Sequence, residues 1–241
     1  MKKAFTIFGG IAAAALATAC SHANAEEPGP NGTRNFQVGG FQKLAVSGPF
    51  EVRVRSGAYS VSARGPQNIL DTMLVEVRGD TLVIHPRKEG GKFRWNWGRH
   101  DTINIVVTAP ALRGAEIAGS GGIRIESVRG DRFDGAIQGS GDLSVASLDV
   151  KSLNLAIGGS GSMKASGRAN LLALNIEGSG DIDTSQVAAE TASASIGGSG
   201  NISARATRSA AINIMGSGNV EIRGGAHCTI NKSGSGDVRC S

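Results

Sequence analysis

The sequence predicts an all-β fold: a parallel β-helix or β-solenoid of 18–20-residue coils, preceded by a less regular β-rich part. Three observations carry this prediction. A Gly-Ser-Gly triplet occurs seven times, at steps of 20, 20, 19, 20, 18 and 18 residues, and such periods suit one coil of a solenoid. Aliphatic and polar residues alternate on both sides of each triplet, as in strands with one buried face. Glycine accounts for 36 of the 241 residues, whereas aromatic residues make up 4% and none follows Phe133.

The aliphatic positions coincide when the seven triplets are superimposed. Because equivalent positions stack about 4.8 Å apart in parallel strands, we expect a ladder of β-branched side chains to fill a narrow core. Two residues before the triplet, six coils have isoleucine: Ile117, Ile137, Ile157, Ile176, Ile196 and Ile214. Two residues after it come Ile123, Leu143, Met163, Ile182, Ile202, Val220 and Val238. The seventh coil has Lys232 at the isoleucine position, which we interpret as a polar cap that stops further stacking.

The triplets are interpreted as structural turns, because glycine takes positive φ and lets successive coils approach closely. Their first glycines are Gly119, Gly139, Gly159, Gly178, Gly198, Gly216 and Gly234. The residues that follow the triplets are mostly turn formers and would stack as a polar ladder: Gly122, Asp142, Ser162, Asp181, Asn201, Asn219 and Asp237. Calcium ligands are the alternative, but calcium-binding β-helices repeat G-G-x-G-x-D about every nine residues. This chain lacks that spacing, so no metal or other cofactor is expected.

The N-terminal part, residues 36–110, is also strand-rich. In "LAVSGPFEVRV" (44–54), Leu44 takes the isoleucine position, Ser47 and Gly48 the corner, and Phe50 and Val52 the buried pair of a first, degenerate coil. Further alternation predicts strands near 59–63, 73–77, 81–85 and 102–107, and 65–72 is predicted as a short helix or a turn. Residues 36–241 are therefore expected to form a single domain, irregular over 36–110 and regular over 111–241.

Residues 1–25 have the features of a bacterial secretory signal, with two lysines before a long apolar stretch. Cleavage after Ala25 and lipoprotein processing at Cys20 are both compatible with the sequence; the second would attach the chain to a membrane through a lipid. Residues 26–35 are expected to be a flexible mature N-terminus. No further apolar run approaches the ~20 residues of a transmembrane helix. We expect an exported protein of the periplasm or cell surface, in which Cys228 and Cys240 form a disulfide.

The segment 86–100, "PRKEGGKFRWNWGRH", interrupts the strand pattern. From Glu26 onward the chain has 23 basic and 20 acidic residues, and without this segment the count is 18 against 19. All of the positive excess therefore lies here. One interpretation is a binding site for an anionic glycan or a lipid headgroup, made by Lys92, Arg94, Trp95, Trp97 and Arg99. The alternative is that the tryptophans pack back as a cap on the solenoid while the charges stay solvated. Nucleic acid is not an expected partner, and a homo-oligomer is left open.

No catalytic pattern is evident. The histidines outside the signal, His85, His100 and His227, are scattered without a zinc-type companion pattern, and no serine has the Gly-x-Ser-x-Gly elbow. A solenoid could bring Asp142 near Asp181 or Asp183, as a glycosidase requires. A carbohydrate-active lyase or hydrolase on a β-helix is thus the alternative to a non-enzymatic surface protein, and a self-assembling element is a third candidate.

The combination of "VSGPFEV", "NILDTMLVEVRGDTLVI" and the repeated Gly-Ser-Gly-[Asp/Asn]-aliphatic corners resembles one protein family over roughly residues 40–238. It is the family called putative auto-transporter adhesin, head GIN domain. The resemblance implies a right-handed β-helix-like fold in a bacterial envelope protein, an adhesin-like or envelope-associated binding or structural module. It brings no catalytic residues with it.

Overall fold

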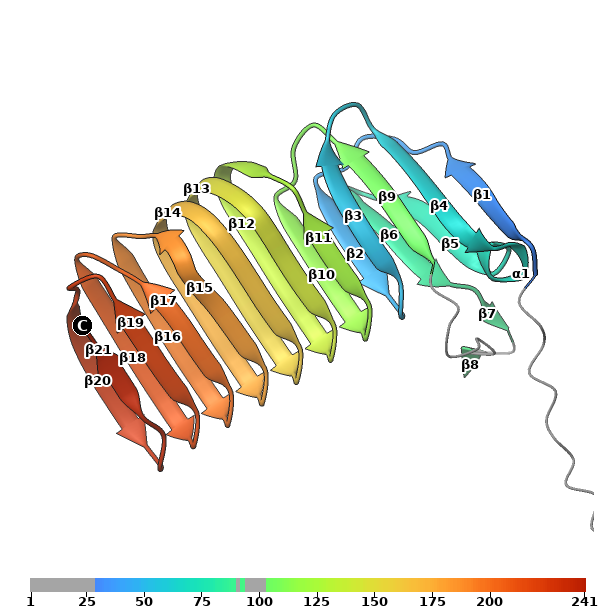
Figure 1. The fold of residues 1–241 in the computed structure, drawn as a ribbon. Helices are drawn as coiled ribbons and strands as arrows, with labels where there is room; N and C mark the ends of the chain where they lie inside the picture. The colour runs from blue at the N-terminus through green and yellow to red at the C-terminus, as the bar shows by residue number, and fades with distance from the viewer. Residues whose placement is uncertain (1–28, 90–91, 94–102) are drawn as a thin grey trace, which may run out of the picture.

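The predicted solenoid is confirmed by a computed structural model, which describes residues 29–89, 92–93 and 103–241 (Figure 1). Its strands stack into one elongated body with two main layers. One layer contains, in stacking order, β5 (Met73–Arg78), β6 (Thr81–Pro86), β2 (Lys43–Ser47), β10 (Gly114–Gly119), then the C-terminal halves of β12 (Val128–Gly139), β13 (Asp142–Gly159) and β14 (Ser162–Gly178), and β16 (Thr191–Gly198), β18 (Ser209–Gly216) and β20 (His227–Ser233).

The second layer lies across the core and begins after each corner. It contains β1 (Asn31–Phe36), β4 (Ser60–Pro66), β9 (Asn104–Ala109), β3 (Glu51–Ser56), β11 (Gly122–Ile125), the starts of β13 and β14, β15 (Asp181–Ala188), β17 (Asn201–Arg205), β19 (Asn219–Arg223) and β21 (Val238–Cys240). The short strands β7 (Lys88–Glu89) and β8 (Lys92–Phe93) form a separate hairpin. In the stacking order of both layers, all neighbouring strands from β2 and β3 to the C-terminal end pair in parallel. This parallel stacking makes the repeating coil.

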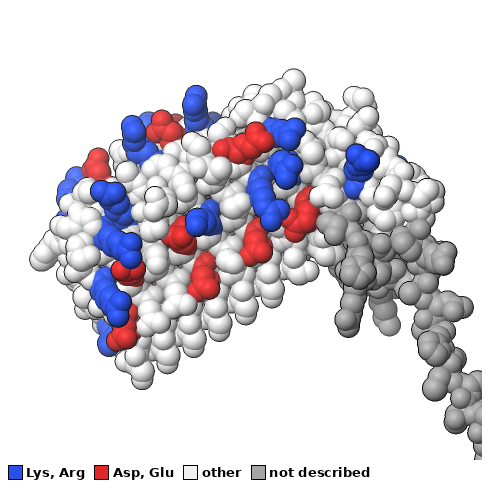
Figure 2. Space-filling model, in the orientation of Figure 1, with Lys and Arg blue, Asp and Glu red and all other residues white. Residues whose placement is uncertain are grey.

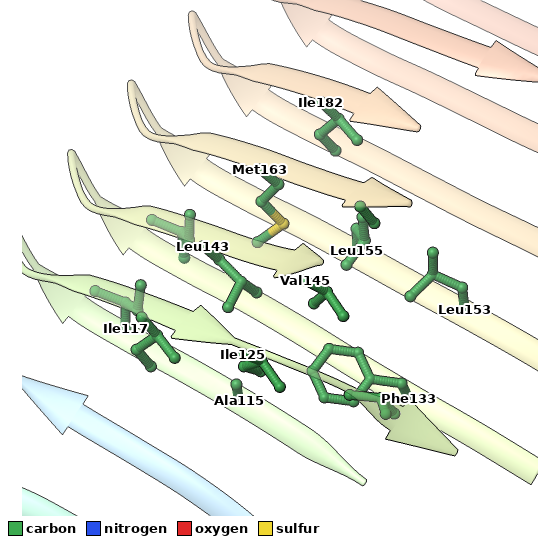
Figure 3. Packing of buried hydrophobic residues seen from close by; sticks show 14 of the residues in the cluster. Ala115, Ile117, Ile125, Phe133, Leu143, Val145, Leu153, Leu155, Met163 and Ile182 are labelled. Atoms are coloured by element: carbon green, nitrogen blue, oxygen red, sulfur yellow. The ribbon is translucent and has the colours of Figure 1, made fainter. Parts of the chain in front are cut away.

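The isoleucine ladder is present as predicted. Parallel pairing places Ile117, Ile137, Ile157, Ile176, Ile196 and Ile214 in one column, and each is at most 1% exposed. Figure 3 shows side chains of both layers pointing into the space between them, among them Ile117, Leu143 and Leu155. Phe133 fills part of the same core and is fully buried. Because burial of apolar surface requires the coil above and the coil below, each coil is stable only within the stack.

The corners bring backbone against backbone. The first glycine of each triplet has φ between +126° and +135°, a region that disfavours residues with a Cβ. The serine N–H of one corner donates to the glycine carbonyl of the preceding corner, as from Ser160 to Gly139 at 2.9 Å and from Ser199 to Gly178 at 2.9 Å. A Cβ on Gly198 would overlap the Gly178 carbonyl oxygen. The missing side chain therefore permits both the turn and the coil spacing.

The register of the first coil differs from the prediction. Val46, not Leu44, pairs with Ile117 and takes the isoleucine position, and Val52 and Val54 pair with Ile123 and Ile125. The predicted positions are wrong by two residues. Leu44, Val46, Phe50, Val52 and Val54 are all buried, so a shift by two keeps every side chain on its face and alternation alone does not distinguish the registers. The corner itself is where the sequence predicts it, because Gly48 has φ of +114°; only the flanking strand positions are shifted.

The N-terminal end is closed by antiparallel strands and one helix. The predicted strands near 59–63, 73–77, 81–85 and 102–107 correspond to β4, β5, β6 and β9, and α1 (Gln67–Leu70) lies within 65–72. Ile69 and Leu70 of α1 are buried in the end of the core. The segment 26–35 was expected to be flexible, but Asn31–Phe36 forms β1, which pairs antiparallel with β4.

The C-terminal end has a different closure. Lys232 pairs with Ile214 in register, and its Nζ donates to the carbonyl of Gly236 at 2.7 Å. The predicted disulfide joins Cys228 of β20 to Cys240 of β21, with Cα atoms 6.6 Å apart. It links the two layers of the last coil. Ile230, which lies in β20 two residues after Cys228, is 49% exposed because no further coil covers it.

Two adjacent glycines provide a matched test of the corner geometry. We predict that Gly198→Ala lowers the free energy of unfolding by at least ~2 kcal/mol, because the new Cβ meets the Gly178 carbonyl in an unfavourable φ region. Gly197→Ala is the control, since its Cβ would have only the Ile176 carbonyl oxygen at 3.9 Å nearby; it should change stability by less than ~1 kcal/mol. Urea denaturation measures both, and equal effects of the two substitutions would refute the corner account.

Candidate functional site

The segment predicted to bind a ligand lies mostly outside the described residues. Arg94, Trp95, Trp97 and Arg99 are outside them, as are His100 and Cys20. Lys92 belongs to β8, but its side chain is not described. The described chain reaches this segment at Pro86 and resumes at Ile103, and both are buried. The Ile103 carbonyl accepts a hydrogen bond from the N–H of Glu51 at 3.2 Å. The segment is thus inserted between two strands that are fixed in the core.

An apolar hollow of about 320 Å³ adjoins the first of these two points. It is lined by Pro86 and by the first two corners: Ser47, Gly48, Pro49, Ala118, Gly119 and Ser120. Two adjacent corners leave this space because glycine and alanine present no large side chain there. None of the described residues that line it is titratable, so the chemistry that they offer is apolar contact.

A histidine lies beside the same point. The His85 side chain is 18% exposed, with Nδ1 3.0 Å from the Pro86 carbonyl and Nε2 3.1 Å from Oε1 of Glu76. The pKa of Glu76 is lowered, mainly by the hydrogen bond from His85 and next by the hydrogen bond from Arg78. Both His85 nitrogens face acceptors, so the ring is used in holding β6 to β5. It is not oriented toward an open site.

The outer face of the second layer carries the predicted polar ladder. Ser162 donates to Asp142 at 2.7 Å, Asn201 to Asp181 at 2.7 Å, and Asn219 to Asn201 at 2.9 Å. The N–H of Asp237 continues the series by donating to Asn219 at 3.0 Å. Side chains at equivalent positions therefore bind one another from coil to coil.

Charged residues cover the same face, which we call the charged face. Figure 2 shows acidic and basic side chains interspersed across it. Several are paired between neighbouring strands or along one strand: Arg124 with Glu51, Arg55 with Glu126, Lys164 with Asp183, and Arg223 with Glu221. These pairs are largely exposed, so each contributes little to stability. Their alternation gives the face no extended region of one sign.

The acids considered for glycosidase chemistry meet at a second hollow, of about 360 Å³, which Asp142, Asp181, Asp183, Arg124 and Lys164 help to line. Their oxygens are engaged in the ladder or with Ser185 and Lys164. Partial burial raises the pKa of Asp183, but the Ser185 hydroxyl and N–H and then Lys164 outweigh it, so the pKa is lowered. A general acid requires the opposite shift. Among the described residues, no group of His, Cys, Asp and Glu is arranged to hold a metal ion.

Fold and surface together define a β-solenoid whose chemistry lies in its exposed side chains, with its repeats used as scaffold. The chain belongs to the family described as "Putative auto-transporter adhesin, head GIN domain", whose model matches residues 40–226. This confirms the family resemblance seen in the sequence. The family is named for adhesins, not for enzymes. No helix within the described part of the chain is long and apolar enough to span a membrane.

Solved structures share the fold over most of the chain. A "putative adhesin" from Bacteroides fragilis NCTC 9343 has a TM-score of 0.78 at 25% identity, covering 88% of this chain and 97% of that one. A "Putative lipid binding protein" from Parabacteroides distasonis ATCC 8503 has 0.67 at 24%, covering 88% and 97%. A "putative adhesin" from the same organism has 0.67 at 19%, covering 88% and 98%. The last two show the fold alone. No curated protein matches the sequence.

The acid sensitivity of the charged face can be predicted from Asp183. Its pKa is below the ordinary 3.8, so ionised Asp183 stabilises the fold above that value, and the contribution is lost as the pH falls through the lowered pKa. We predict that stability decreases between pH 5 and pH 2 less steeply in Asp183→Asn than in the wild type. Asp149→Asn, on a side chain without a resolved partner among the described residues, is the control. Thermal unfolding against pH measures both, and parallel curves for wild type and Asp183→Asn would contradict the assignment.

Proposed function

We propose that the protein is a non-enzymatic, exported β-solenoid that acts as an adhesin-like, envelope-associated binding module. Residues 1–25 serve as its export signal, and the folded chain resides in the periplasm or on the cell surface, with Cys20 as a lipid anchor if lipoprotein processing occurs. Family membership supports this proposal, as does the "putative adhesin" from Bacteroides fragilis. The engagement of the solenoid acids in structural hydrogen bonds argues against hydrolytic chemistry on the described face.

The proposed binding element is segment 86–100, with Lys92, Arg94, Trp95, Trp97 and Arg99 as the contact residues. One observation carries this assignment: the whole positive excess of the chain after residue 25 is concentrated in this segment. Across the described strands, by contrast, acids and bases are interspersed and largely paired. Guanidinium groups beside indoles suit a ligand that offers phosphate or carboxylate next to a ring or an apolar surface. An anionic glycan or a lipid headgroup has that chemistry.

The insertion point supports the same assignment. Pro86 and Ile103 are buried, and Ile103 is hydrogen-bonded to Glu51. A binding segment is more effective when it begins and ends on rigid strands, because less conformational freedom is then lost when the ligand binds. The apolar hollow lined by Pro86 adds a surface for the uncharged part of the same ligand.

The test is binding of the purified protein to a glycan array and to vesicles of neutral and of anionic lipid. We predict binding to acidic glycans or anionic vesicles that weakens at least ~10-fold in Trp95→Ala, Trp97→Ala and Arg94→Ala and decreases with salt. Lys151→Ala is the charge control, because Lys151 lies in β13 and not in this segment, is exposed and is paired with Asp131 at 2.7 Å. Absence of wild-type binding would overturn the proposal. If the tryptophan variants have lower melting temperatures but unchanged affinity, the indoles form a cap on the solenoid and do not contact the ligand.

A further inference from the structure

The face of the solenoid opposite the charged face is almost without charge. It is formed by β13 to β20 in the layer that precedes the corners, and we call it the uncharged face. Its outward side chains alternate with the buried ladder residues. They are Ser152, Asn154, Ala156, Gly158, Leu171, Ala173, Asn175, Glu177, Thr191, Ser193, Ser195, Gly197, Ser209, Ala211, Asn213, Met215, His227, Thr229, Asn231 and Ser233. Only Glu177 among these twenty carries a formal charge at neutral pH.

The charges that do occur lie around the edges of this face. Glu177 immediately precedes the corner glycine Gly178 and so lies at the corner rim. Along the opposite rim, Lys151 pairs with Asp131 and Arg208 pairs with Glu190. Depletion of charged residues at the centre, inside a charged rim, is one feature of protein interfaces. Exposed β-surfaces that must stay solvated ordinarily carry charged side chains.

One column of polar side chains on this face lacks partners within the described chain, whereas Asn154, Thr191 and Ser209 nearer its edges are hydrogen-bonded. Asn175, Ser195, Asn213 and Asn231 stack in one register column, yet none makes a side-chain hydrogen bond within the described chain. On the charged face, the equally stacked Asn201 and Asn219 are bonded to their neighbours. Met215 and Leu171 are 62% and 49% exposed on the uncharged face. The face thus offers one column of amides and a hydroxyl without a partner in the described chain, together with two exposed apolar side chains.

The shape of the face favours another flat sheet as its partner. Small-ligand and sugar sites are concave and usually contain aromatic side chains, whereas these outward residues include no Phe, Tyr or Trp and most are short. Short side chains allow a second sheet to approach to about 10 Å, and amides stacked in columns can then pair across the contact. A twofold contact needs a surface compatible with itself, which an uncharged centre satisfies.

We propose that the uncharged face is the contact surface between two copies of this chain. Five strands at about 4.8 Å and four outward positions at about 7 Å cover roughly 24 by 28 Å, or about 670 Å² per copy and about 1,300 Å² in total. This area lies near the lower end of the range for a specific interface. The dimer is therefore weak and reversible in solution, and its two charged faces point outward.

The experiment compares two serine-to-lysine variants by sedimentation equilibrium from about 10 μM to about 1 mM protein. Ser195→Lys puts a charge in the centre of the uncharged face, and Ser203→Lys, between Asp183 and Glu221 on the charged face, is the matched control. We expect the average mass of the wild type and of Ser203→Lys to rise toward twice the monomer mass with concentration. Ser195→Lys should stay monomeric, with an unchanged circular dichroism spectrum.

Asn213→Lys replaces Ser195→Lys if the latter does not fold, and the same loss of dimer is expected. A wild type that is monomeric at every concentration would overturn the proposal, as would equal association of wild type and Ser195→Lys. A third outcome is retention of the monomeric wild type on insoluble cellulose, lost in Ser195→Lys but kept in Ser203→Lys. This would show that the face binds a neutral polysaccharide, and it would also overturn the proposal.

Discussion

The close approach of successive glycine corners is the constraint on which the rest of the structure depends. In the five corners from Ser140 to Ser217, the serine N–H donates to a glycine carbonyl in the corner before it, and a glycine at φ near +130° makes that spacing accessible. Since the corner fixes the position of each coil relative to the next, it also fixes the register of the flanking strands. The isoleucine column and the polar ladder both follow from that register.

A fixed register has consequences for function. Each outward position becomes a column along the solenoid, so a compositional bias at one repeat position becomes a property of a whole face. One face collects interspersed charges and the other collects short uncharged side chains. The insertion between β6 and β9 interrupts the repeat. Specific recognition is therefore expected where the repeat is interrupted, whereas extended contact is expected on a regular face.

Much of this organisation could be predicted from the sequence because the physical signals are local and repeated. The triplet spacing predicted the coil, and the recurring isoleucine predicted the buried column of the core. Lys232 and the paired cysteines indicated the last coil. The first coil was placed two residues off, because alternation fixes the face of a strand and not its register. β1 was missed because Asn31–Phe36 has a single apolar residue, and the strand is held by backbone pairing with β4 and by Arg34, which lies over Phe36 and donates to Leu70. The uncharged face was also missed, although its signal is present as the lack of charge at alternate positions from Ser152 onward.

The most direct test of this account is the amide hydrogen exchange of the corner serines. If the corners hold the coils in register, the N–H groups of Ser160, Ser179, Ser199 and Ser217 should exchange as slowly as those of the adjoining strands, although their side chains lie at the surface. The same serines in an ordinary exposed turn would exchange orders of magnitude faster. Fast exchange at the corners beside slow exchange in the strands would contradict the central claim, because the strands alone would then set the register.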